Sequence, residues 1–124
     1  MTQPRALAGQ RAEDTALEHL ESRGLTLIAR NFRCRLGEID LVMLHGQSLV
    51  FVEVRSRKVS RFASAVESVD PRKQQKLARA AGFFLSRRPA FRDHPVRFDV
   101  VALDGPSPDR YELQWLRDAF RPGS

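Results

Sequence analysis

Residues 37–55 read GEIDLVMLHGQSLVFVEVR: two mainly apolar segments that flank a short polar turn. Gly46 and Gln47 suit the two central positions of a tight hairpin turn, where the first position favours glycine. A four-residue loop at the same place would give the same register. The stretch therefore predicts a β-hairpin with antiparallel strands over about 38–44 and 49–56.

The turn also predicts which charged residues face each other across the hairpin. Counting back from the turn places Asp40 opposite Glu53 and Glu38 opposite Arg55. Directly opposed residues on one face of a sheet have Cβ atoms about 4.5–5.5 Å apart. The four charged side chains are therefore expected to cluster at the end of the hairpin away from its turn.

The alternation of residue types predicts that both faces of the hairpin are covered. One face carries only apolar residues: Ile39, Leu41, Met43, Val50, Val52 and Val54. The other carries Val42, Leu44, Leu49 and Phe51 near the turn and the charged cluster farther along. A solvated face would not collect large apolar side chains at one parity.

Two carboxylates about 5 Å apart repel each other by about 3 kcal/mol at an effective dielectric constant of about 20. A divalent cation with oxygen ligands would offset the repulsion between Asp40 and Glu53. Arg55 could offset part of it instead, in which case the cluster is only a structural one at the rim of a sheet. Bulges or a slipped register would break the pairing.

Glu13 adds a third carboxylate to this hypothesis. It lies three, four and seven residues before Ala16, Leu17 and Leu20, on the apolar side of a helix predicted over 8–23. A glutamate is rarely placed there without a partner. The alternative is an ion pair with Arg11 or another nearby arginine.

The remaining chain completes a single mixed α/β domain over residues 1–124, with its core at about 8–120. The predicted elements are a strand over 25–32, a loop over 58–70, a helix over 71–86, a strand over 96–103, a turn over 104–109, a short strand over 111–114 and a final helical turn over 115–120. Arg97 and Asp99 share a strand face and are interpreted as a structural pair.

The positive charge is concentrated in one part of the chain. The formal net charge is +6, but residues 54–97 carry twelve Lys and Arg against three acids. Such a stretch favours binding to a polyanion, above all a nucleic acid, although it could also be a solvated surface. The predicted phosphate-binding residues are Arg57, Lys58, Arg72, Lys73, Lys76 and Arg79.

Several classes of protein are disfavoured by what the sequence lacks. No apolar run approaches the roughly 20 residues that span a bilayer, and the first ten residues lack the apolar stretch of a signal peptide. One cysteine, Cys34, cannot form an internal disulfide, so a cytoplasmic location is expected. The three histidines lack the spacing of a zinc site, and phosphate-binding or hydrolase glycine motifs are absent from the sequence.

The sequence resembles the YraN-like family of uncharacterised bacterial proteins over about residues 8–120. The resemblance rests on Gly9, Glu13, Leu20, Gly24, Arg30-Asn31, GEIDL at 37–41, VFVEVR at 50–55, Lys73, Lys76-Leu77, RFDV at 97–100 and Asp118-Ala119-Phe120. That family looks like a member of the restriction-endonuclease-like PD-(D/E)xK nuclease superfamily, alongside archaeal Holliday junction resolvases. The resemblance implies an α/β/α core in which helices flank a mixed sheet with a central antiparallel hairpin.

Position by position, the resemblance implies that Asp40, Glu53 and the helix residue Glu13 bind Mg²⁺ or Mn²⁺. Arg55 stands where the superfamily has a lysine that positions or polarises the attacking water. An arginine stays protonated, so it can stabilise charge but cannot accept a proton. Lys73 or Lys76 could supply the basic role instead.

Three hypotheses for function follow. The first is a metal-dependent endonuclease that cleaves structured DNA, such as junctions or flaps, in repair or recombination. The second is a non-catalytic nucleic-acid-binding protein that keeps the endonuclease-like fold, and the third is a domain that docks on an acidic protein. The sequence leaves open whether the chain is an enzyme and whether it forms a homodimer.

Overall fold

A computed structural model describes residues 4–57, 69–105, 110 and 112–122. The elements are α1 (Pro4–Ser22), β1 (Thr26–Cys34), β2 (Gly37–His45), β3 (Ser48–Arg57), α2 (Pro71–Ser86), the short 3-10 helix η1 (Pro89–Phe91), β4 (Val96–Asp104) and β5 (Glu112–Phe120). Neither helix in this part of the chain is long and apolar enough to cross a membrane. Of the predicted loop over 58–70 and turn over 104–109, residues 58–68 and 106–109 lie outside the described residues.

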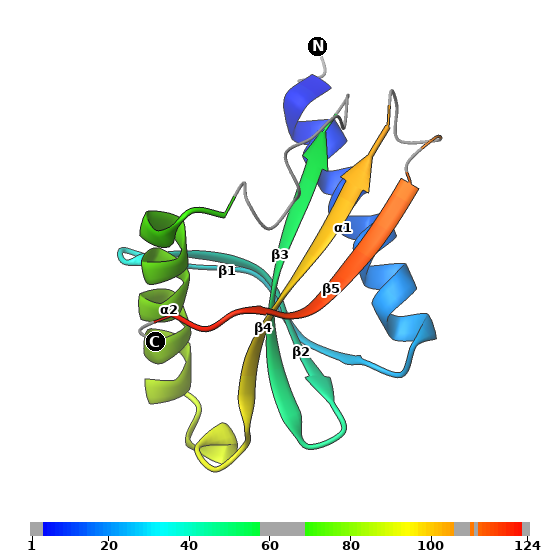
Figure 1. Cartoon of the computed structure of the whole chain (residues 1–124). Helices are drawn as coiled ribbons and strands as arrows, with labels where there is room; N and C mark the ends of the chain where they lie inside the picture. The colour runs from blue at the N-terminus through cyan, green and yellow to red at the C-terminus, as the bar shows by residue number, and fades with distance from the viewer. Residues whose placement is uncertain (1–3, 58–68, 106–109, 111, 123–124) are drawn as a thin grey trace.

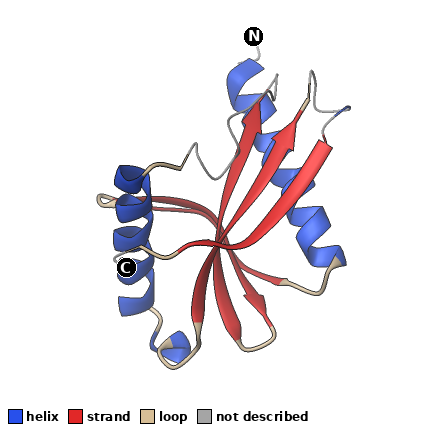
Figure 2. Cartoon of the chain, in the orientation of Figure 1, coloured by secondary structure: helices blue, strands red, loops and turns tan. Residues whose placement is uncertain are grey.

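The five strands form one twisted sheet in the order β1-β2-β3-β4-β5. Neighbouring strands are antiparallel except for β3 and β4, which run parallel. A parallel pair needs a crossover connection, and α2 provides it. Figures 1 and 2 show α1 and α2 on opposite sides of the sheet. The predicted mixed sheet with a central hairpin and flanking helices is confirmed.

Each helix buries its apolar stripe against one face of the hairpin. On the α1 side, Ala12, Ala16 and Leu20 belong to one core cluster with Leu41, Met43, Val50 and Val52. On the α2 side, Leu77, Ala80, Ala81 and Phe84 belong to another with Val42, Leu49 and Phe51. The alternation along the hairpin therefore correctly predicted two covered faces. Ile39 is the exception, because it joins the cluster beneath α2.

Both helix ends have local causes. Gly24 follows α1 with φ +94°, a left-handed conformation that glycine adopts readily and that commonly ends a helix. Asp70 caps the start of α2, where its carboxylate accepts a hydrogen bond of 2.9 Å from the backbone N–H of Lys73. Pro71 occupies the first turn, where no N–H is needed. The predicted helix over 71–86 is confirmed.

The predicted helical turn over 115–120 is wrong, because these residues continue strand β5. Trp115 packs against the core cluster on the α1 side, whereas its neighbour Leu116 packs against the one beneath α2. The register with β4 shifts between Phe98 and Val100, and Asp118 has φ +50°. This irregularity disturbs the two-residue alternation, so the short segment resembles a helical turn in sequence.

Candidate functional site

The candidate site begins where β2 and β3 stop pairing. The ladder runs through five residue pairs, from His45–Ser48 to Leu41–Val52, which confirms the predicted register over that length. The expected pairings of Asp40 with Glu53 and of Glu38 with Arg55 do not continue it. Instead, Asp40 Oδ2 accepts a 2.8 Å hydrogen bond from the backbone N–H of Val54. A side-chain oxygen thus takes a hydrogen bond that the backbone ladder would otherwise use, which corrects the prediction.

An open cavity of about 550 Å³ lies at this point, between the hairpin and the first half of α2. Its lining includes six of the predicted site residues: Asp40, Glu53, Arg55, Arg72, Lys73 and Lys76. Arg79 is exposed farther along α2 and does not line it. Arg57 ends β3, where its backbone is in register with Asp104 of the parallel strand β4. Lys58 lies outside the described residues. The fold therefore brings acidic residues of the sheet close to basic residues of a helix.

Glu53 is the most enclosed carboxylate of the cavity, with 7% of its side chain exposed. Its Oε2 lies 3.1 Å from Lys73 Nζ and 3.4 Å from Arg55 Nη1. Two of the three candidates for the basic role, Lys73 and Arg55, thus contact the same carboxylate oxygen. The helix lysine is the nearer of the two.

Asp40 is partly buried, and its pKa is raised from the ordinary 3.8 to about 7. Burial is the largest cause, because it disfavours the charged form. The negative charge of Glu53 is the next cause, and those of Glu13 and Glu38 add to it, whereas the hydrogen bond from Val54 opposes the rise. The site therefore holds one carboxyl group that is costly to ionise without an added positive charge.

The other two predicted acids each pair with an arginine of β1. Glu13 Oε1 lies 3.4 Å from Arg30 Nε, and Glu13 is not among the residues that line the cavity. Glu38 lies at the cavity but pairs with Arg33 at 2.9 Å rather than with Arg55. In the part of the chain that the structure describes, no three His, Cys, Asp or Glu side chains form a group that could hold a metal. Glu13 is therefore not gathered with the two hairpin carboxylates as a third ligand.

Two residues that the sequence analysis did not assign also shape the cavity. A Cβ added at Gly37, whose φ is +154°, would lie only 3.2 Å from the carbonyl oxygen of Lys76. A side chain at residue 37 would therefore press against the backbone of α2, and glycine allows the start of β2 to approach it closely. Asp70 lines the cavity while it caps α2. The pair Asp70-Pro71, a capping residue followed by a first-turn proline, was the available sequence signal for it.

The raised pKa of Asp40 predicts how the stability of the metal-free protein depends on pH. The folded state keeps the proton up to about pH 7, whereas the unfolded chain loses it near 3.8. This carboxyl should therefore lower the free energy of unfolding as the pH rises through that interval, by about 4 kcal/mol in all. Urea unfolding in EDTA at pH 5 and pH 8 should show about 3 kcal/mol of this loss, because the rest falls below pH 5.

Asp40→Asn is the matched variant for that measurement, because the amide oxygen can still accept from Val54 and carries no charge. Its advantage in unfolding free energy over the parent should be small at pH 5 and should grow by pH 8. Other groups that titrate in this range contribute equally to both proteins. An advantage of the same size at both pH values would contradict the assignment.

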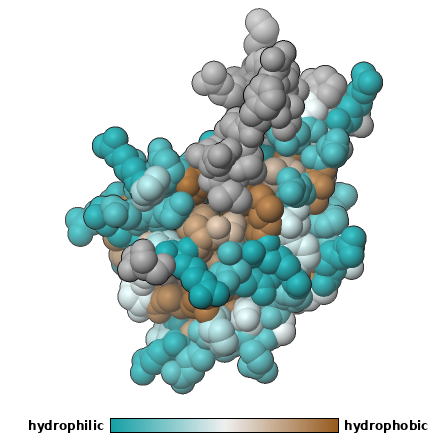
Figure 3. Space-filling model, in the orientation of Figure 1, coloured by the Kyte–Doolittle hydropathy of each residue, from teal (hydrophilic) through white to brown (hydrophobic). Residues whose placement is uncertain are grey.

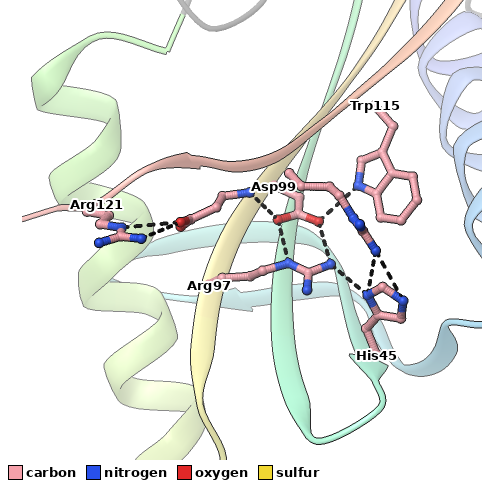
Figure 4. A network of polar contacts seen from close by, with 7 residues as sticks. His45, Arg97, Asp99, Trp115 and Arg121 are labelled. Carbon is pink, nitrogen blue, oxygen red and sulfur yellow. Dashed lines mark hydrogen bonds and ion pairs between the residues drawn. The ribbon is translucent and has the colours of Figure 1, made fainter.

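A second polar cluster surrounds Asp99 of β4, which is fully buried and lies in register with Val52 of β3 (Figure 4). Arg97 donates two hydrogen bonds to its carboxylate, at 3.0 and 3.1 Å. Trp115 Nε1 and the backbone N–H of Asp118 each donate another at 2.9 Å. These contacts tie β4 to the irregular part of β5. The interpretation of Arg97 and Asp99 as a structural pair is confirmed.

The chain is similar to bacterial proteins whose descriptions state no activity. The model of the uncharacterised protein family UPF0102 matches residues 12–103. A UPF0102 protein of Pseudomonas entomophila is 55% identical over 113 residues, which cover 91% of this chain and 92% of the relative. Another from Stutzerimonas stutzeri is 51% identical over 91% and 93% of the two chains, and one from Pseudomonas syringae pv. syringae is 49% identical over 94% of each.

Proposed function

The chain belongs to the uncharacterised protein family UPF0102, which confirms the resemblance to the YraN-like family, and we propose that it is a metal-dependent nuclease that cleaves DNA. The observation that carries the proposal is the cavity in which Asp40 and Glu53 of the hairpin meet Arg72, Lys73 and Lys76 of α2. Paired carboxylates beside several cations suit a substrate that is a phosphodiester and a cofactor that is a cation.

The donor set fits Mg²⁺ or Mn²⁺. Magnesium prefers oxygen ligands and is commonly held by one or two carboxylates, with water and substrate phosphates completing its shell. Asp40 and Glu53 would supply the two carboxylates, and this preference does not require a group of three acidic ligands, which the described residues do not form. A divalent cation held there would supply an activated water and stabilise negative charge at phosphorus.

The basic residues have distinct places around these carboxylates. Arg72 and Lys76 are exposed at the cavity, where they can bind the phosphates that flank the scissile bond. Lys73 and Arg55 both contact Glu53, so they hold that carboxylate and place positive charge beside the reacting phosphate. Arg55 keeps its charge at any working pH, which restricts it to positioning and charge stabilisation.

The proposal is tested by a cleavage assay on duplex, single-stranded, flap and junction DNA with Mg²⁺, Mn²⁺ or EDTA. Cleavage that requires one of the metals and is lost in EDTA is the expected result. If the parent binds these DNAs but cleaves none of them with either metal, the non-catalytic binding hypothesis replaces this one. RNA versions of the same substrates test the preference for DNA.

Arg55→Ala is expected to reduce cleavage by roughly 100- to 1,000-fold, the loss typical of removing one group that stabilises transition-state charge. Arg55→Lys should retain much of the activity, because a positive charge stays beside Glu53. Single-turnover rates at saturating substrate measure both variants. If Arg55→Ala cleaves as fast as the parent while Lys73→Ala is inactive, Lys73 alone carries the basic role.

A further inference from the structure

The surface of α2 outside the cavity carries positive charge that the described structure does not neutralise. Residues 71–92 contain seven Lys and Arg and no Asp or Glu. Within the described residues, Lys73 is the one member of this group that forms an ion pair. Figure 3 shows that the side of the molecule formed by α2 is largely hydrophilic. This charge is therefore available to an external anion.

Three of these cations on α2 and a fourth at its C-cap, Arg87, form a single stripe. Successive helical residues are about 100° apart, so Arg72, Lys76, Arg79 and Arg87 fall within an arc of about 80° beside the buried stripe. All four are exposed. We call this set the α2 ridge. It begins at the cavity with Arg72 and Lys76 and continues about 22 Å to Arg87, at 1.5 Å per residue.

The far end of the ridge is held in place by an aromatic ring. The guanidinium of Arg87 lies 4.9 Å from the centroid of Phe83, over its face. Phe83 occupies the middle of the same arc and is itself half-buried against Phe32 of β1. The contact restricts the Arg87 side chain before any ligand arrives, which lowers the entropy lost on binding.

We propose that the α2 ridge binds the sugar–phosphate backbone of a double-stranded arm of the substrate, which extends from the cavity towards the C-terminal end of α2. The inference rests on the proposed function for the position of the cleaved bond. At 3.4 Å per base pair, a ridge of about 22 Å spans about six base pairs. The substrate class is thus DNA with a duplex segment beside the cleavage point.

The ridge suits a duplex better than a single strand because it offers charge without stacking surfaces. Proteins that bind single strands combine a basic groove with aromatic side chains on which bases stack. Among the described residues, the exposed large apolar side chains are Leu36 and Val96, neither of which is aromatic or on α2. Phe83, which lies in the same arc as the α2 ridge, is covered by the guanidinium of Arg87. Phosphates are what this surface can recognise.

The test measures binding in EDTA, so that it does not depend on catalysis. Fluorescence anisotropy with a labelled 20-base-pair duplex is compared between the parent and the double variant Arg79→Gln/Arg87→Gln, across a range of salt concentrations. Each lost phosphate contact should reduce the slope of log K against log salt by about 0.9 and weaken binding at 0.1 M salt about eightfold. The double variant should therefore bind about 60-fold more weakly.

Arg23→Gln/Arg110→Gln is the matched control, because it removes two exposed arginines that lie outside α2 and lowers the net charge equally. It should bind within about threefold of the parent, with nearly the same slope. Arg79→Gln alone should give about half of the change in slope. If the ridge variant and the control lose affinity for the duplex equally, the proposed role of the α2 ridge is overturned, because the affinity then depends only on the total charge of the protein.

A single-stranded 20-mer decides the substrate class. The parent should bind it more weakly than the duplex, and the ridge variant should lose less affinity for it. Equal losses on both would overturn the duplex assignment. Cleavage in Mg²⁺ is recorded separately. If the parent is inactive but its duplex binding still depends on the α2 ridge, the proposed nuclease activity is refuted and the binding role of the ridge stands. If the parent is active but its binding does not depend on the ridge, only the binding role of the ridge is refuted.

Discussion

Asp40→Asn is expected to lose at least about 100- to 1,000-fold in cleavage rate, although the same substitution should make the metal-free protein more stable at pH 8. The loss follows from removing one of the two carboxylates that are proposed to hold a cation in the cavity. The gain in stability follows because the asparagine carries no charge to bury or to be repelled by Glu53, the two largest causes that raise the pKa of Asp40 to about 7. Few substitutions at a structural position would change activity and stability in opposite directions.

The measurement pairs a single-turnover cleavage rate with a thermal melting curve for each protein in EDTA. Mg²⁺ or Mn²⁺ should raise the melting temperature of the parent more than that of the variant, because a ligand stabilises only the state that binds it. An Asp40→Asn protein that cleaves at the parental rate would remove Asp40 from the site. Glu112→Ala, which removes an exposed carboxylate at the start of β5, should leave both rate and melting temperature near parental values.

Asp99→Ala is expected to have the largest effect on folding, a loss of about 3–5 kcal/mol in the free energy of unfolding. The Asp99 carboxylate is fully buried and accepts hydrogen bonds from Arg97, Trp115 and the backbone of Asp118. Removing it leaves a mostly buried guanidinium without its counter-ion and two N–H groups without acceptors. Urea unfolding monitored by circular dichroism measures the loss.

Asp99→Asn separates the contribution of the hydrogen bonds from that of the negative charge. The amide oxygen can still accept from an N–H group, but the negative charge opposite Arg97 is gone, so an intermediate loss is expected. His45 cannot replace the lost negative charge: burial and the charges of Arg97 and Arg117 lower its pKa, and its neutral ring can only accept a hydrogen bond from Arg97. A loss below about 1 kcal/mol for Asp99→Ala would show that the cluster is not what holds β5 to β4.

The features that the sequence predicted well are those with a local cause. The turn at Gly46-Gln47 determined the register of the hairpin over five pairs. The apolar alternation on both faces predicted that helices cover both sides of the sheet. Pro71 and the helical spacing of the following apolar residues gave the bounds of α2. Each depends on residues within a few positions of one another, so a periodic pattern or a turn preference is sufficient to identify it.

The errors in the hairpin register and in β5 arose where a tertiary contact outweighs a local pattern. The hairpin register stops at Leu41–Val52 because the side chain of Asp40 bonds to the backbone of Val54. Strand β5 continues through Asp118 because the carboxylate of Asp99, on the neighbouring strand, holds its N–H. A side chain that replaces a backbone partner leaves no periodic trace in the sequence.

By itself, the sequence determined the family, the mixed α/β architecture and the two hairpin carboxylates with Arg55 beside them. The tertiary structure alone decided that Lys73, twenty residues beyond Glu53, reaches its carboxylate, and that Glu13 pairs with Arg30 outside the cavity. The physical reason is that a salt bridge between distant residues depends on how a helix packs across the sheet. That packing is set by the summed burial of many apolar side chains, which no short motif encodes.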